Sequence, residues 1–70
     1  MENYIVLDIE TPNRSRSSIS AIGIVIVENN EIKDTVYSLI NPEDTFEDFI
    51  IEMTGIDSEM VKDKPKFNEF

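Results

Sequence analysis

The chain has 70 residues, of which 40% are hydrophobic, and it contains neither cysteine nor histidine. This length allows one small domain of marginal stability, because a chain of this size leaves much of its surface in water. The composition excludes disulfides and a structural zinc site built from cysteine or histidine. The N-terminus lacks the pattern of a signal peptide, and no apolar run is long enough to span a membrane. We therefore expect a cytoplasmic protein with no membrane partner.

Six basic and fifteen acidic side chains give a formal net charge of −9. A surface that follows nucleic-acid phosphates is usually basic, so the overall charge counts against such a surface in these residues. Much of the acidic excess, however, lies in residues 28–34 and 43–69. Carboxylates that bind divalent metal ions are also neutralised in a working site. The charge therefore leaves open a metal-dependent site near the N-terminus.

Three strands are predicted in the first part of the chain. Residues 4–9 are rich in β-branched and aromatic side chains, which favour a buried strand. A second strand over residues 19–27 is apolar on both faces, which is typical of a central strand covered on two sides. Asn29 and Asn30 suit a two-residue hairpin turn, because asparagine tolerates positive φ. A third strand is predicted over residues 32–40.

Beyond Pro42 the spacing of apolar residues changes to that of a helix. Asp44 or Thr45 can cap the start of this helix, and Gly55 is expected to stop it. We expect the apolar side chains of this helix to lie in the core rather than to contact a cofactor. They occupy positions i, i+3, i+4 and i+7, namely Phe46, Phe49, Ile50 and Met53.

Two shorter helical segments are predicted after Gly55. Asp57 or Ser58 can cap a turn that runs to Val61, with Met60 and Val61 facing inward. Pro65 suits the first turn of a further helix over residues 66–70. One short helix cannot cover both faces of the predicted sheet, so we expect residues 1–70 to be the N-terminal part of a larger domain.

Asp8 and Glu10 lie two residues apart at the end of the first strand, so both side chains leave the same face. Acidic residues are depleted in strand interiors, and two of them on one apolar strand require partners or a ligand. Hard divalent cations prefer oxygen ligands, so this pair suits two Mg²⁺ or Mn²⁺ ions. In two-metal phosphodiester cleavage, ions about 3.5–4 Å apart stabilise the attacking and leaving oxygens. For the pair taken alone, solvated acids at a strand end are the simpler interpretation.

Four further features follow the acidic motif in order along the chain. The motifs, in sequence, are Asp8-Ile9-Glu10-Thr11, Ala21-Ile22-Gly23-Ile24-Val25, Leu39-Ile40-Asn41-Pro42, Thr54-Gly55-Ile56 and Pro65-Lys66-Phe67. Together they resemble the DEDD superfamily of 3′–5′ exonucleases, especially the proofreading (epsilon) subunit of bacterial DNA polymerase III. The resemblance covers essentially all 70 residues and departs at Ala21, where many members carry Glu. It implies an α/β, ribonuclease H-like domain, of which this chain forms the N-terminal part as a three-stranded antiparallel meander followed by short helices.

The resemblance also implies roles for particular side chains. Asp8 would bind both metal ions and Glu10 one of them, as catalytic carboxylates, and Thr11 would meet the 3′-terminal nucleotide. A local turn explains Thr54 equally well, a helix stop is the favoured interpretation of Gly55, and Gly23 is expected to serve packing. Arg14 and Arg16 are expected in a solvated loop rather than on phosphates. The segment that would flank the terminal base or sugar is Thr54, Gly55 and Ile56.

The activity implied is metal-dependent hydrolysis of phosphodiester bonds at the 3′ end of single-stranded or 3′-terminal nucleic acid, with DNA favoured. The family's second-motif Asp and third-motif His and Asp are not matched, and there is no histidine to act as general base. A variant subgroup uses tyrosine there, but Tyr4 and Tyr37 lie in other segments. Groups that act as a unit lose most activity when some are missing, so we predict that the 70-residue chain by itself is inactive.

Two other interpretations stay open. The first is a small acidic, non-catalytic binding module that self-associates through uncovered sheet surface. The second is an exonuclease of the same superfamily that acts on RNA. The resemblance further implies association with a polymerase, as one of its subunits.

Overall fold

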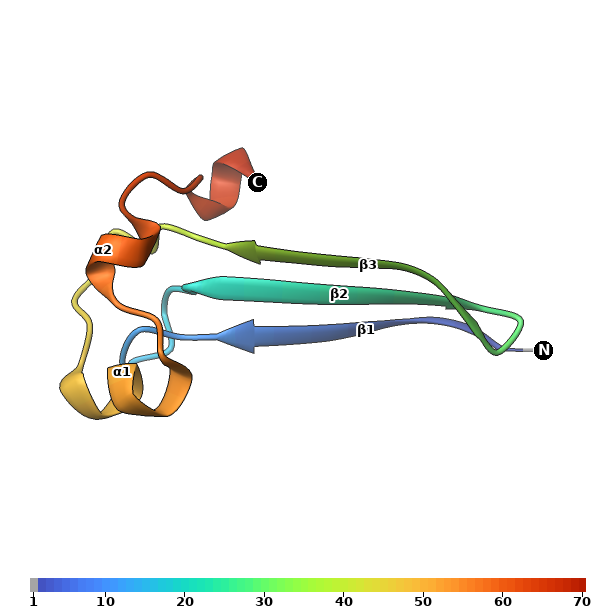
Figure 1. Ribbon diagram of the computed structural model, residues 1–70, viewed down its shortest axis with the longest axis horizontal. Coiled ribbons are helices and arrows are strands. Elements are labelled where there is room, and N and C mark those ends of the chain that lie inside the picture. The colour runs from blue at the N-terminus through green and yellow to red at the C-terminus, as the bar shows by residue number, and fades with distance from the viewer. Residues whose placement is uncertain (1) are drawn as a thin grey trace.

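A computed structural model describes residues 2–70 as a three-stranded sheet with helices gathered at one end (Figure 1). The sheet is antiparallel throughout, and its order is β1-β2-β3, so the second strand is central as predicted. The elements are β1 (Asn3–Glu10), β2 (Ala21–Glu28), β3 (Glu31–Leu39), α1 (Asp48–Thr54), α2 (Ser58–Val61) and the 3₁₀ helix η1 (Phe67–Glu69). The expected meander followed by short helices is confirmed, and the strand boundaries differ from the predicted ones by one or two residues.

The hairpin between β2 and β3 turns at Asn29 and Asn30. Both residues have positive φ, 53° and 65°, as a two-residue hairpin turn requires. The ladder then carries an irregularity: the register shifts between Ile26 and Val27, so that one extra residue of β3 is accommodated. The turn is therefore as predicted, whereas the shift is not visible in the apolar pattern.

The start of α1 differs from the prediction. The residue before its first turn is Glu47, with no side-chain cap, so neither Asp44 nor Thr45 caps the helix. The helix starts later because the segment before it is bonded to the loop after β1: the Glu47 backbone N–H donates to the Pro12 carbonyl at 3.0 Å. The Asp44 carboxylate accepts from the Ser18 hydroxyl at 2.8 Å instead of capping. Contacts with the loop after β1 thus place the start of α1 later in the sequence than predicted.

The remaining helix signals give mixed outcomes. Gly55 ends α1 in the left-handed conformation, φ 75°, and Asp57 caps α2 by accepting from the Met60 N–H at 3.0 Å, as predicted. Val61 is buried, but Met60 is exposed, because α2 is a single turn that presents one side to the core. Pro65 lies before η1 rather than in its first turn, since its carbonyl accepts from Asn41 at 2.9 Å.

The core lies where the helical segment meets the end of the sheet. Ala21, Ile56 and Val61 form its buried cluster, against which Leu39 and Phe46 pack. The prediction that Phe49 and Met53 are core side chains is wrong: they are exposed, Met53 by 75%. The helix α1 sits beyond the strand ends in Figure 1, so most of its apolar stripe has no sheet surface beneath it.

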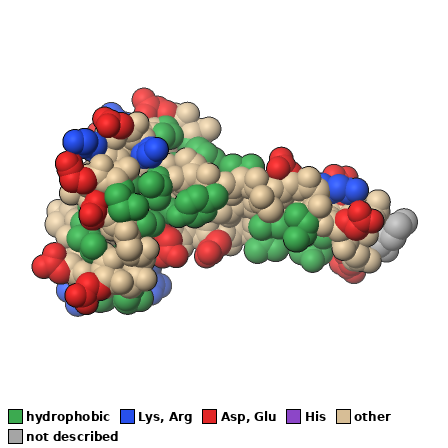
Figure 2. Space-filling model, in the orientation of Figure 1, with side chains coloured by type: hydrophobic (Ala, Val, Ile, Leu, Met, Phe, Trp, Pro, Cys, Tyr) green, Lys and Arg blue, Asp and Glu red, His purple; other side chains and the backbone are tan. Residues whose placement is uncertain are grey.

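Both faces of the sheet remain largely uncovered over the described residues. Figure 2 shows hydrophobic side chains at the surface along the extended part of the molecule. The prediction that β2 is covered on two sides is therefore not met within residues 2–70, where its middle is only half-buried. No helix in the described range has both the length and the apolar character to cross a membrane. The exposed large apolar side chains of the sheet are Tyr4, Ile5, Val6, Leu7, Ile9, Ile32, Val36 and Tyr37.

Candidate active site

Asp8 and Glu10 lie at the end of β1 that points toward the helices (Figure 1). Asp8 pairs with Gly23 of β2, and Glu10 pairs with Ala21. Residues directly opposite each other in an antiparallel ladder share a face, so both carboxylates lie on the face that carries the core alanine. Asp8 is exposed and Glu10 is half-buried. The two-residue spacing therefore places the acids together as expected, at the edge of the core.

A small hollow of about 100 Å³ opens beside these carboxylates. Its walls come from all three strands and from the connection between α1 and α2. Four of the six residues predicted for the site line this hollow, and the other two, Thr11 and Gly55, do not. The residues that line it include Asp8, Glu10, Gly23, Tyr37, Thr54 and Ile56.

The connection between α1 and α2 reaches the hollow because it is anchored on both sides. The Gly55 N–H donates to the Ile51 carbonyl at 2.7 Å and closes α1. The Thr54 hydroxyl donates to the Ile50 carbonyl at 3.0 Å and accepts from the Ile56 N–H at 3.2 Å, which is the local turn role expected as one alternative. The buried Ile56 side chain then fastens the segment to the core.

The donor set suits a hard divalent cation. Carboxylate oxygens are the ligands that Mg²⁺ takes in proteins, commonly one or two carboxylates together with several waters. Asp8 and Glu10 supply two such groups on one face. Among residues 2–70 there is no group of three or more acidic, histidine or cysteine side chains placed to hold a metal ion. The described chain therefore offers part of a coordination shell, as the unmatched second and third motifs imply.

Gly23 and Tyr37 are two site residues that sequence reasoning did not identify. Gly23 was assigned to packing alone, and Tyr37 was assigned no part in the site. Gly23 pairs with both Asp8 and Tyr37, so the three residues form one row across the sheet. A glycine in a central strand indicates that another group approaches closely. The row formed by these three residues could not be predicted, because it depends on the strand register.

The loop after β1 is fastened to the start of α1 beside the site. The Glu47 carboxylate accepts from the Arg14 backbone N–H at 2.6 Å and pairs with its guanidinium at 2.9 Å. That guanidinium also lies 5.3 Å from the centre of the Phe49 ring. The Asn13 side chain donates to the Thr45 carbonyl at 2.7 Å. Arg14 therefore pairs with Glu47 while its side chain stays 74% exposed, and Arg16 is also exposed in this loop, as expected.

We expect this attachment to be lost in acid. The Arg14 guanidinium and N–H hold the pKa of Glu47 below its usual value, and the Ser18 hydroxyl and the Thr45 N–H lower the pKa of Asp44. Carboxylates whose pKa is lower in the folded state contribute stability above their unfolded pKa, about 4, and lose it as the pH falls through the folded pKa. The protection of the amide hydrogens of residues 13–18 against exchange, measured relative to the intrinsic rate at each pH, should therefore fall in that acidic range.

The matched variants for this prediction lie in and next to α1. Glu47→Gln should give the fast exchange of residues 13–18 already at neutral pH, whereas the exposed Glu52→Gln should behave as wild type. Unchanged protection of these amides across the acidic range, or an equal effect of both variants, would contradict the role of the carboxylate.

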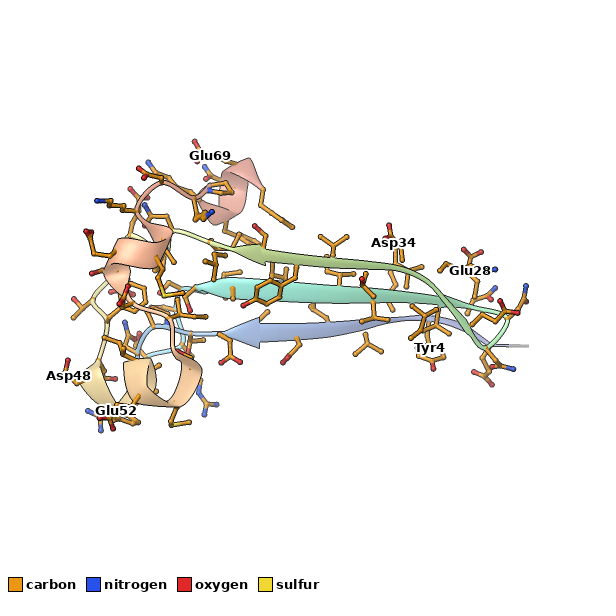
Figure 3. The ribbon with its side chains drawn as sticks, viewed as in Figure 1. Tyr4, Glu28, Asp34, Asp48, Glu52 and Glu69 are labelled. Carbon is orange, nitrogen blue, oxygen red and sulfur yellow. The ribbon has the colours of Figure 1, made fainter. Side chains whose placement is uncertain are left out.

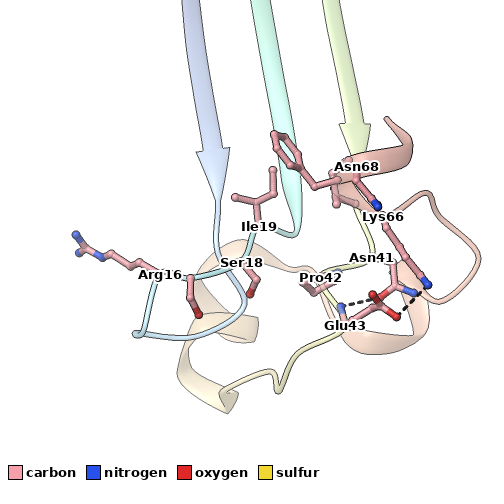
Figure 4. A pocket seen from close by; sticks show the side chains of 11 residues that line it. Arg16, Ser18, Ile19, Asn41, Pro42, Glu43, Lys66 and Asn68 are labelled. Atoms are coloured by element: carbon pink, nitrogen blue, oxygen red, sulfur yellow. Dashed lines mark hydrogen bonds and ion pairs between the residues drawn. The ribbon is translucent and has the colours of Figure 1, made fainter.

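A larger hollow of about 510 Å³ lies between the loop and the C-terminal segment (Figure 4). Two basic residues line it, Arg16 and Lys66. The Lys66 ammonium pairs with the Glu43 carboxylate at 3.1 Å, and this contact raises the pKa of Lys66. Half of the positive charge in this hollow is thus neutralised by the protein itself, which weakens its attraction for phosphates.

Comparison with known proteins decides the family. The family described as Exonuclease matches residues 5–70, nearly the whole chain. The chain belongs to this exonuclease family. The resemblance to 3′–5′ exonucleases seen in the sequence motifs is thereby confirmed, as is the fold that it implied.

Two relatives illustrate this family membership. The DNA polymerase III PolC-type of Caldanaerobacter subterraneus is 41% identical over 68 residues, which are 94% of this chain and 5% of that protein. The 3′-5′ exonuclease DinG of Staphylococcus aureus is 37% identical over 71 positions, covering 99% of this chain and 8% of that protein. The chain therefore spans less than a tenth of the length of either relative.

Proposed function

We propose that this chain is the metal-binding N-terminal part of a domain that hydrolyses phosphodiester bonds of DNA from the 3′ end. The observation that carries the proposal is the convergence of Asp8 and Glu10 with Thr54 and Ile56 at one hollow. The carboxylates would hold two Mg²⁺ or Mn²⁺ ions, which when bound stabilise the oxygens of the reacting phosphate. Family membership and the likeness to a protein named 3′-5′ exonuclease support this activity.

The protein's own residues would hold and orient the end of the strand. Asp8 and Glu10 would hold the ions at the end of β1, where pairing with β2 positions the backbone of both residues. Thr54, Gly55 and Ile56 would flank the terminal sugar or base, and Thr11 would meet the same nucleotide. Because the Thr54 hydroxyl is used in the turn, its contribution would be to shape the segment.

We expect the purified chain to cleave nothing detectable. Two carboxylates without a histidine provide neither a full metal shell nor a general base, and such groups act as a unit. The measurement is degradation of 5′-labelled single-stranded DNA in Mn²⁺. Robust shortening from the 3′ end that disappears in Asp8→Ala would overturn the expected inactivity while supporting the metal site.

Binding tests the proposed substrate without requiring turnover. Linear single-stranded DNA should bind in Mg²⁺ and be competed by unlabelled linear strand but not by a circular strand of the same sequence, which has no 3′ end. An RNA strand of that sequence distinguishes the DNA-directed activity from the RNA-directed alternative. Equal competition by the circular strand would remove the 3′-end assignment. The likeness to a PolC-type polymerase supports a polymerase context for the activity.

A non-catalytic, self-associating module is the second candidate, and the uncovered sheet favours it. Tyr4, Leu7 and Ile32 are among many apolar side chains exposed on the strands. Large exposed apolar surface of this kind marks interaction sites. Light scattering over a range of concentrations distinguishes the two candidates, because a chain that stays monomeric while binding DNA ends excludes the second.

A further inference from the structure

Tyr37 shares a row of the sheet with the first catalytic carboxylate of the proposed site. Asp8 pairs with Gly23, and Gly23 pairs with Tyr37 on its other side. Directly paired residues share a face, so the tyrosine and the carboxylate project to the same side with only a glycine between them. Both line the small hollow.

The irregularity in the β2–β3 ladder is what brings Tyr37 to this face. A regular ladder from the Asn29–Asn30 turn would pair Gly23 with Val36 and leave Tyr37 on the opposite face. The register shift between Ile26 and Val27 moves β3 by one residue, and Gly23 pairs with Tyr37 instead. A bulge of this kind commonly re-aims a side chain next to a functional site.

The absence of a side chain at position 23 lets the tyrosine ring lie against the strand. A Cβ at Gly23 would stand 3.7 Å from Tyr37 Cδ1 and 3.9 Å from the Asp8 carbonyl oxygen. The ring therefore occupies the space beside the bare backbone of β2 and leans toward β1. Tyr37 is nevertheless 67% exposed, so much of the ring surface is open to a ligand.

The hollow beside Asp8 and Glu10 has room for metal ions but not for the base of a nucleotide. At about 100 Å³ the hollow is smaller than the roughly 300–1,000 Å³ of pockets that hold small molecules. That volume suits hydrated ions and reacting oxygens, but the base of a nucleotide must lie outside it. The exposed aromatic ring on its rim is that of Tyr37.

We propose that Tyr37 is the platform on which the base of the 3′-terminal nucleotide stacks. This inference rests on the proposed function and adds to it the residue that receives the base. Stacking on an aromatic ring tolerates every base, because each has a π-face. The site should therefore hold 3′-terminal thymidine and adenosine with similar affinity.

The test measures binding of a 5′-fluorescein-labelled single-stranded oligothymidylate to the full chain in Mg²⁺. Tyr37→Leu should weaken binding about tenfold, within the range seen when an aromatic platform is removed from one base. Tyr37→Phe keeps the ring and should stay within about twofold of wild type. Tyr4→Leu is the matched control, since Tyr4 is also an exposed tyrosine, by 50%, but lies at the far end of the sheet (Figure 3).

A second probe separates the contribution of the terminal base to binding from that of the phosphates. An oligothymidylate with a 3′-terminal abasic sugar should bind wild type about tenfold more weakly, whereas Tyr37→Leu should not distinguish the two probes. If Tyr37→Leu fails to fold, nuclear magnetic resonance of the wild-type ring replaces it. The ring protons of Tyr37, and not those of Tyr4, should shift upfield on adding the oligonucleotide.

The possible outcomes distinguish a failure of the stacking role from a failure of the proposed function. Wild-type binding that is unchanged in folded Tyr37→Leu, or ring protons that do not shift at saturation, overturns the stacking role and leaves the proposed function standing. A loss in Tyr37→Phe equal to that in Tyr37→Leu also overturns stacking, because it assigns the effect to the hydroxyl. Absence of any oligonucleotide binding by wild type in Mg²⁺ overturns both.

Discussion

Replacing Asp8 by asparagine is expected to weaken Mn²⁺ binding by at least about tenfold and to leave the fold intact. Loss of a group that merely orients a ligand costs about 10–100-fold in metal affinity, so loss of a direct carboxylate ligand should cost no less. Asp8 is exposed, and exposed substitutions usually change stability by less than about 0.5 kcal/mol. Paramagnetic broadening of backbone amide signals by Mn²⁺ locates the ion and measures its affinity.

The control for the metal site is another acidic residue of the sheet. Asp34 lies in β3 near the end of the sheet away from the helices, where Figure 3 labels it. Asp34→Asn removes the same charge from the chain, so it corrects for the general attraction of a cation to a protein of net charge −9. Equal losses in both variants, or broadening centred away from Asp8 and Glu10, would contradict the assignment of the metal site.

Replacing Ile40 by alanine is expected to lower the free energy of unfolding by about 2–5 kcal/mol. Ile40 is 0% exposed, and its N–H donates to the Ser20 carbonyl at 2.8 Å where the chain leaves β3. Truncating it removes apolar contacts and leaves a cavity at the junction of the sheet and the helical segment. A chain of this length has a total stability of only about 4–10 kcal/mol, so the loss is a large share of it.

Thermal unfolding followed by circular dichroism measures this loss, and a second isoleucine provides the control. Ile32 of β3 is 69% exposed, so Ile32→Ala should change stability by less than about 0.5 kcal/mol. A shift of about 4–8 °C per kcal/mol is expected for a domain of this size. Equal melting temperatures for the two variants would contradict the structural role of Ile40.

Much of the strand architecture could be predicted because its signals are local. The β-branched runs indicated three strands, and the tolerance of Asn29 and Asn30 for positive φ indicated the turn between two of them. Gly55 and Asp57 were identified as helix boundaries for the same reason, since each acts on backbone groups within a few residues. Such features need no knowledge of distant parts of the chain.

The start of α1 and its exposed apolar stripe could not be predicted in this way. Asp44 has the chemistry of a helix cap, but its carboxylate bonds to Ser18, far away in sequence. Phe49 and Met53 have helical spacing, yet apolar spacing only shows which residues share a face and not whether another surface covers it. The first error arose because a contact with a distant segment outweighed a local preference, and the second because no other part of residues 2–70 covers this side of α1.

The geometry of the acidic pair follows directly from its spacing along the chain. The two-residue period of a strand places Asp8 and Glu10 on one face whatever the rest of the chain does. Which other residues join them on that face depends on tertiary contacts. A one-residue shift in the β2–β3 register turned Tyr37 to their side of the sheet, and burial of Ile56 carried Thr54 to the same hollow. Both depend on how separate segments pack against each other, and neither a register shift nor such packing is encoded in residue spacing.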